Sequence, residues 1–115
     1  MSTRFEIVLA DDGSYVFQLR SNAGELLLKG PHCPSKIMTQ NGILHLRRAL
    51  QHPELMEAHT NADGSSFIVV RDQDGSALAR SRRAASDTVR EDLERSLCEA
   101  AGAPMIDLTK HRSAG

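Results

Sequence analysis

The chain repeats one pattern at a constant spacing of 51 residues, and this repeat constrains the fold more than any other feature. Residues 5–50 align with residues 56–101 without an insertion. Identical residues recur at the paired positions Glu6/Glu57, Asp12/Asp63, Gly13/Gly64, Ser14/Ser65, Arg20/Arg71, Gly24/Gly75, Ser35/Ser86, Leu46/Leu97 and Ala49/Ala100. Two copies of one supersecondary unit are therefore predicted, one in each half of the chain.

The size of each half indicates how the two copies are combined. The chain has 115 residues, which fits one domain, while a half of about 45 residues lies near the size at which a lone core rarely suffices. We therefore expect a single domain over residues 1–115, in which repeats at 5–50 and 56–101 share one hydrophobic core. The polar residues 110–115 are expected to form a loose tail.

Alternating apolar and polar residues predict strands at the start of each repeat. Residues 5–9 place Phe, Ile and Leu on one face of a first strand. The Asp-Gly pairs at 12–13 and 63–64 suit tight hairpin turns, because glycine readily adopts a positive φ. Third strands are predicted at 25–29 and 76–80, so each repeat should begin with an antiparallel meander.

The pattern then changes to helical spacing. Ser35 and Ser86 stand where a side-chain oxygen can cap the first free amides of a helix. The expected buried faces carry Met38, Gly42, Leu46 and Ala49 in the first helix and Val89, Leu93, Leu97 and Ala100 in the second. Because glycine is unfavourable inside a helix, Gly42 is expected to permit a close approach of the helix to the sheet or to its partner helix.

The predicted fold class is α+β, with two tandem β-β-β-α repeats related by pseudo-twofold symmetry around one core. A further short strand is expected at 105–109. The residues predicted to line the shared core are Phe5, Ile7, Phe17, Leu19, Leu46, Ile68, Val70, Leu93 and Leu97.

The Asp-Gly hairpin, the strand at 15–20, the glycine turn and the helix segment Asn41-Gly42-Ile43 resemble the YegP-like family of small bacterial tandem or single-repeat domains. The resemblance covers roughly residues 5–109 and is weaker in the second repeat. There the helix segment reads Asp92-Leu93-Glu94, and the Asn-Gly turn of the family is absent from both repeats. The family has no established biochemical activity, so the resemblance implies a symmetric two-unit fold and no catalytic residues.

Histidines and cysteines form no pattern of a metal or nucleophilic site. His32 and Cys33 are adjacent, and adjacent ligands rarely both reach one ion without a strained backbone. Cys33 and Cys98 occupy non-equivalent positions of the repeat, so both are interpreted as reduced thiols rather than a disulfide. No serine lies in a Gly-x-Ser-x-Gly elbow. The sequence therefore predicts no catalytic residue, no metal and no cofactor.

Arg80, Arg82 and Arg83 precede the second predicted helix, in an outline similar to that of double-stranded RNA readers. Aromatic residues make up only 3% of the chain, and its net charge is −1. Both values argue against a surface that stacks bases and neutralises phosphates. A solvated surface is the favoured interpretation of these three arginines, and a weak nucleic-acid patch is the alternative.

Arg20 and Arg71 differ from the other arginines because they occupy the same place in both repeats. In the structural interpretation each lays its stem on the sheet and pairs with a carboxylate such as Glu6 or Glu57, which also repeat. In the functional interpretation the two arginines are symmetric contacts for an anion or a partner. Both interpretations remain open at this point.

The function predicted from these features is a non-enzymatic binding or interaction module with an unknown partner, and the alternatives are a weak nucleic-acid binder or an enzyme with an unrecognised site. No apolar run approaches the roughly 20 residues that cross a bilayer, and the first residues lack the apolar run of a signal peptide, so we expect a cytoplasmic protein without membrane contact. A monomer is expected because duplication supplies an internal partner, although exposed edge strands could form a homodimer.

Overall fold

A computed structural model describes residues 2–109, so the predicted tail at 110–115, which includes His111, lies outside the described residues. The elements of the first unit are β1 (Arg4–Leu9), β2 (Tyr15–Arg20), β3 (Leu26–Lys29) and α1 (Lys36–Ala49). The second unit, after the 3-10 turn η1 (Pro53–Leu55), contains β4 (Met56–Thr60), β5 (Ser66–Arg71), β6 (Ala77–Ser81) and α2 (Asp87–Glu99). The 3-10 turn η2 (Ala100–Gly102) and the short strand β7 (Met105–Asp107) follow.

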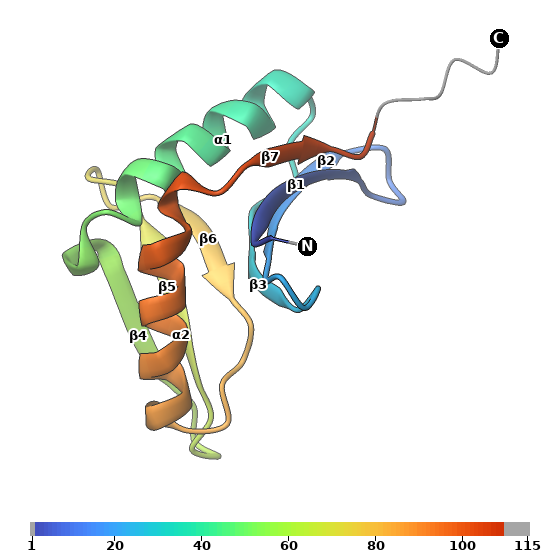
Figure 1. The fold of residues 1–115 in the computed structure, drawn as a ribbon. Coiled ribbons are helices and arrows are strands. Elements are labelled where there is room, and N and C mark those ends of the chain that lie inside the picture. The colour runs from blue at the N-terminus through green and yellow to red at the C-terminus, as the bar shows by residue number, and fades with distance from the viewer. Residues whose placement is uncertain (1, 110–115) are drawn as a thin grey trace, which may run out of the picture.

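The strands form one seven-stranded sheet in the order β4-β5-β6-β3-β2-β1-β7. All neighbours are antiparallel except β7, which pairs in parallel with β1. Figure 1 shows β1–β3 and β4–β6 as two groups of strands, with α2 in front of the second group. The predicted α+β class and the predicted short strand near residue 105 are confirmed.

The hairpin turns follow from local chemistry in both units. Gly13 and Gly64 adopt φ values of 84° and 86°, which a residue with a Cβ rarely adopts. The Asp12 carboxylate accepts a 2.9 Å hydrogen bond from the amide of Ser14, and Asp63 does the same for Ser65. Such bonds hold the pKa of each aspartate below its ordinary value, with the side-chain hydroxyl of the serine as the largest cause. The predicted turns are therefore confirmed.

Both helices begin at their predicted caps. The Ser35 hydroxyl accepts from the amide of Met38 at 3.2 Å, and the Ser86 hydroxyl accepts from the amide of Val89 at 3.3 Å. Each bond satisfies one of the amides that a helix start leaves without a partner. Within residues 2–109, no helix is long and apolar enough to cross a bilayer.

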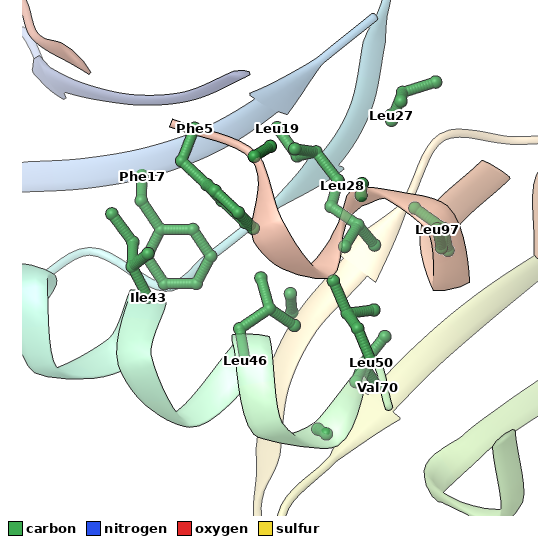
Figure 2. Close-up of a cluster of buried hydrophobic side chains, with 14 of the residues drawn as sticks. Phe5, Phe17, Leu19, Leu27, Leu28, Ile43, Leu46, Leu50, Val70 and Leu97 are labelled. Carbon is green, nitrogen blue, oxygen red and sulfur yellow. The ribbon is translucent and has the colours of Figure 1, made fainter. Parts of the chain in front are cut away.

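The core lies between the two helices and one face of the sheet. All nine side chains predicted to line it belong to a single cluster of buried residues, which contains residues of both units. Figure 2 shows Ile43 and Leu46 of α1, and Leu50 just after the helix, pointing toward Phe17 of the first unit and Val70 of the second. The helix of the first unit thus packs on strands of both units, as its contacts with β1, β2, β5 and β6 also indicate.

The predicted buried face of α1 is partly wrong. Met38 is 52% exposed, whereas Thr39 and Ile43 are completely buried. The face is rotated because Gly42 lies against the edge of Phe17, where a Cβ would be 3.0 Å from Cε2 of the ring. The expected close approach of the helix to the sheet at Gly42 is confirmed. Leu9 was expected to continue the buried face of β1, but it is 51% exposed near the hairpin turn.

Candidate functional site

The face of the sheet opposite the helices is the candidate functional site. The core side chains, such as Phe17 and Ile68, lie on the face against which both helices pack. Side chains at alternate strand positions point to the other face. No helix within residues 2–109 covers that other face, which we call the open face.

One row of register partners crosses the open face through all seven strands. From β4 to β7 the row reads Glu57, Val69, Arg80, Lys29, Gln18, Glu6 and Ile106. Directly opposite residues in neighbouring strands place their side chains next to each other on one face. Lys29 of β3 and Arg80 of β6 are therefore direct neighbours at the middle of the row, with one glutamate toward each end.

Glu6, near the β7 end of the row, is held by two arginines. Nε of Arg4 donates to Oε2 of Glu6 at 2.9 Å, and Nε of Arg20 lies 3.3 Å from Oε1. Arg20 also donates from Nη1 to the carbonyl oxygen of Gly24 at 2.9 Å. Arg4 and Glu6 are buried, whereas the Arg20 side chain is 31% exposed. The carboxylate therefore joins two strands of the sheet, and Arg20 joins them to the β2–β3 turn.

Glu57, at the β4 end of the row, forms a two-pronged pair with Arg71. Nε and Nη2 of Arg71 each lie 3.1 Å from a Glu57 oxygen, and Nη1 donates to the carbonyl oxygen of Gly75 at 3.0 Å. His59 also hydrogen-bonds the carboxylate. The Arg71 hydrogen bonds, followed by the His59 bond, lower the pKa of Glu57, and the same pair raises the pKa of Arg71. The predicted pairing of both repeated arginines with repeated glutamates is confirmed.

The three arginines of the alternative nucleic-acid patch lie in different surroundings. Arg82 lies 4.0 Å from a Glu25 oxygen, and Arg83 lies 3.9 Å from an Asp63 oxygen. Arg80 makes no ion pair within residues 2–109 and stacks on Phe67, with its guanidinium carbon 3.9 Å from the ring centroid. Because two of the three positive charges have acidic neighbours, these arginines do not form a continuous cationic strip.

Phe67 of β5 lies between Arg80, at the middle of the open face, and His59 of β4, at the edge of the sheet. Its ring is stacked with that of His59, with centroids 5.0 Å apart and an angle of 8° between the planes. His59 comes from β4 and Arg80 from β6, the two strands that flank β5. Side chains from both neighbouring strands therefore already contact this ring, and it is not available as a platform for a nucleobase.

A groove of about 390 Å³ borders the Lys29 and Arg80 side chains. At one end of the β3–β6 pairing, the amide of Arg82 donates to the carbonyl oxygen of Leu27 at 3.0 Å. The residue 51 positions before Arg82 is Pro31, which has no amide hydrogen and cannot make the equivalent bond. The register pairing of β3 with β6 ends at Lys29 and Arg80, and Pro31 and Leu78 line the groove beyond that point.

Ser14, His32 and Asp12 lie close together at the β1–β2 hairpin, although sequence reasoning did not connect them. The Ser14 hydroxyl is 2.7 Å from Nδ1 of His32 and donates to Oδ1 of Asp12. The cluster does not have the order of a catalytic triad, in which the imidazole lies between the hydroxyl and the carboxylate. Here the hydroxyl bonds the carboxylate directly, and hydroxyl and carboxylate approach the same ring nitrogen.

The position equivalent to His32 strengthens the structural interpretation of this cluster. It is occupied by Arg83, which approaches Asp63 as His32 approaches Asp12. An arginine cannot act as a general base at neutral pH. Both units therefore place a nitrogen-bearing side chain beside the aspartate of the hairpin, which is a connection between loops rather than a catalytic arrangement.

Other candidate chemistry is also weak in the described part of the chain. No group of three or more His, Cys, Asp or Glu side chains within residues 2–109 could hold a metal ion. Burial, followed by Glu94 and Glu99, raises the pKa of the Cys98 thiol, which disfavours the nucleophilic thiolate. A hollow of about 570 Å³ lies beside the end of α2, and among residues 2–109 only Glu99 on its wall is titratable.

The cation pair at the centre of the open face was missed by sequence reasoning. Lys29 and Arg80 are 51 residues apart, so the repeat already marks them as equivalent positions with the same charge. The two residues are alike in charge but not identical, so the pair is visible only when residues 51 apart are matched by charge. Their direct opposition could not have been found in this way, because it depends on β3 and β6 being neighbours in the sheet.

Comparison with known proteins adds information about the fold alone. No family model and no curated protein sequence matches the chain. The solution structure of yegP, a protein of unknown function from E. coli, matches with a TM-score of 0.87 and 22% identity over 97% of each chain. A UPF0339 protein from Shewanella oneidensis matches with a TM-score of 0.84 and 17% identity over 100% of each chain. The predicted resemblance to the YegP-like family is therefore confirmed, and the chain has the fold of these two proteins.

Proposed function

We propose that the chain is a non-enzymatic binding module that contacts its partner through the open face of the sheet. The observation that carries this proposal is the contrast between the ends and the middle of the row on that face. The ends are held by the Arg4–Glu6–Arg20 and Glu57–Arg71 groups, whereas the middle has two cations beside a groove. A surface that is rigid at its ends and open at its centre suits binding more than packing.

The absence of a catalytic arrangement within residues 2–109 supports a binding role over an enzymatic one. The Ser14 cluster is exposed and has the wrong order for proton transfer. The Cys98 thiol is disfavoured as a nucleophile by its raised pKa. Enzymatic acyl or phosphoryl transfer typically directs a nucleophile, a base and a group that stabilises developing charge at one point.

Arg20 and Arg71 are proposed as contacts at the rim of the open face. Each arginine pairs with a glutamate and donates a hydrogen bond to a turn carbonyl. About a third of each side chain is nevertheless exposed, 31% for Arg20 and 36% for Arg71. Their ion pairs hold the guanidinium groups in place, which reduces the entropy lost when a partner binds.

We also propose that the two units are repeats of one domain, related by a pseudo-twofold axis that passes between Lys29 and Arg80. The support is the antiparallel pairing of these two residues, which are equivalent by the 51-residue spacing. With such an axis, the row has Glu6 and Glu57 at matched places on either side. A monomer is the expected state, because each unit already contributes to the core of the other.

A photo-crosslinking experiment tests the location of the binding face. A benzoylphenylalanine at Gln18 places the reactive group on the open face, and the matched control at Leu44 places it on the exposed side of α1. After irradiation in cells that express the chain, mass spectrometry should detect a defined adduct from position 18 and none from position 44. Adducts from position 44 alone, or none from either position, would contradict the proposal.

The double variant Arg20→Gln and Arg71→Gln, combined with the probe at Gln18, tests the rim contacts. We expect the adduct to be lost while the variant still folds. A lower melting temperature with an unchanged adduct would instead assign both arginines a purely structural role.

A further inference from the structure

We propose that Lys29 and Arg80 form a binding site for a phosphate monoester at the centre of the open face. This inference rests on the proposed function, because it names the ligand chemistry of the same surface. It begins with the charges of the two residues and their positions in neighbouring strands.

Lys29 and Arg80 are direct register partners in the β3–β6 ladder, and both side chains are exposed on the open face. Like charges that lie directly opposite in a sheet repel each other. Neither residue is paired with a carboxylate within residues 2–109, whereas Arg20 and Arg71 on the same face are. An anion bound between them would remove this repulsion, so the free protein favours binding of negative charge at this point.

Arg80 is held in an orientation suited to an oxyanion. Its guanidinium group lies over Phe67, with the carbon atom 3.9 Å from the ring centroid, and Phe67 is in turn stacked on His59. Stacking uses the flat face of the guanidinium group and leaves the N–H groups at its edge free to donate. Lys29 adds a compact charge from the neighbouring strand.

The chemistry of the pair favours a phosphate monoester over a carboxylate. A phosphate monoester carries about −1.5 to −2 charges at pH 7, which matches two cations, whereas a carboxylate carries one. Arginine binds phosphate oxygens with two parallel hydrogen bonds, and lysine binds them as a point charge. The site therefore has both the charge and the donors that this group requires.

The groove beside the two cations indicates what the phosphate is attached to. Val69, Leu78 and Pro31 contribute apolar surface to its wall. Phe67 is already stacked by side chains from both flanking strands, and no aromatic residue within residues 2–109 lines the groove to stack a nucleobase. The geometry therefore points to a phosphate ester with a small apolar or aliphatic group rather than to a nucleotide.

An NMR titration tests the site with two probes, inorganic phosphate and butyl phosphate, against sodium chloride at matched ionic strength. We expect saturable shifts of the Lys29 and Arg80 amides with both phosphates and none with chloride. Butyl phosphate should bind more tightly than inorganic phosphate and should also shift Leu78. Shifts that do not saturate, or that chloride reproduces, would overturn the inference.

Three variants locate the binding energy. Lys29→Gln and Arg80→Gln should each weaken phosphate binding roughly tenfold or more, as expected for a lost hydrogen bond to a charged group. Lys29→Arg should retain phosphate binding, because it keeps the positive charge. The matched control Arg48→Gln removes an exposed arginine of α1 and should leave the affinity unchanged. Equal affinity in all variants, or equal loss in the control, would overturn the assignment.

Melting temperatures separate binding from a structural role. Without phosphate, Lys29→Gln should melt no lower than the unmodified chain, because it relieves the repulsion between two cations. With phosphate, the unmodified chain, Lys29→Arg and Arg48→Gln should all gain stability, whereas Lys29→Gln and Arg80→Gln should gain much less. A large loss of melting temperature in Lys29→Gln without phosphate would contradict the inference. The binding-module proposal would survive that result if crosslinks still formed from position 18, and it would fail separately if they formed only from position 44.

Discussion

The two units solve one packing problem with different side chains. In the first unit the buried ring of Phe17 lies against two glycines. A Cβ at Gly30 would be 2.3 Å from Cε2 of the ring, and a Cβ at Gly42 would be 3.0 Å from the same atom. In this unit, one large side chain of the sheet therefore leaves no room for a side chain at Gly30 and little room for one at Gly42.

The second unit distributes the volume differently at the equivalent positions. Ile68 replaces the phenylalanine, and Ser81 and Leu93 replace the two glycines. All three are buried, and the Ser81 hydroxyl accepts a 2.8 Å hydrogen bond from the amide of Ile68. What the two units have in common is the filled space and not the individual side chains, as expected for cores packed to a constant density.

The carboxylates of the row differ between the units in a similar way. Glu6 is buried between Arg4 and Arg20, whereas Glu57 lies on an exposed edge strand with Arg71 and His59. The difference follows from the sheet order, because β7 covers the outer edge of β1 and no strand within residues 2–109 covers the outer edge of β4.

The largest difference between the units is expected for these two glutamates. Glu6→Ala leaves Arg4 buried without its partner and should lower the free energy of unfolding by about 3–5 kcal/mol. Glu57→Ala removes an exposed pair and should change stability far less. Urea unfolding of both variants measures the contrast. Equal losses would show that the covered edge of β1 does not make its ion pair more important.

Leu46 and Leu97 should behave alike, because both occupy the same repeat position and both are completely buried. Each change to alanine should lower the free energy of unfolding by about 2–5 kcal/mol, since a cavity remains in the core. Unfolding should stay a single transition in both variants when followed by circular dichroism and by fluorescence of an added probe. Two separate transitions would refute a core shared by both units.

Gly30 and Ser81 should respond to alanine for different reasons. Gly30→Ala forces a methyl group into Phe17 and should cost about 1–3 kcal/mol. Ser81→Ala leaves the buried amide of Ile68 without its acceptor, which should also cost about 1–3 kcal/mol.

The background variant Phe17→Ile separates the two causes. It should reduce the effect of Gly30→Ala, because the ring that clashes is gone, and it should leave the effect of Ser81→Ala unchanged. If the smaller side chain rescues neither variant or both, the size exchange between the units is not the reason for the glycine.

Gly42 should show the smallest effect, because two contributions oppose each other. Alanine is more favourable than glycine in a helix by about 1 kcal/mol, but its methyl group would lie 3.0 Å from Phe17. We expect Gly42→Ala to lower the free energy of unfolding by up to about 1 kcal/mol. In a Phe17→Leu background, Gly42→Ala should stabilise the protein. Thermal melts of the unmodified chain, the two single variants and the double variant provide the test.

Local features of the fold could be predicted from the sequence because their causes are local. The turns at Gly13 and Gly64, the caps Ser35 and Ser86 and most of the strand residues follow from backbone preferences and side-chain periodicity. The orientation of α1 could not be predicted, since it depends on the ring of Phe17 from another element. Periodicity alone therefore placed Met38 in the core and overlooked Ile43.

For the candidate site, the sequence predicted the ion pairs of Arg20 and Arg71 but not the cation pair. The two ion pairs could be inferred because each arginine and its glutamate repeat together at the same spacing. The groove at Pro31 also has a local cause, the missing amide hydrogen, but it is a groove only because β6 runs beside it. Neighbouring strands could not be deduced from residue types alone.

By itself, the sequence determined the repeat, the order of strands and helices, the turns and the residues that prefer burial. Each of these follows from interactions within a few residues of the chain or from the apolar character of a side chain. The tertiary structure alone decided that β3 meets β6, that β7 covers β1 and that Lys29 faces Arg80. These pairings join segments far apart in the sequence, and they form because together they bury the core and satisfy the backbone of every central strand.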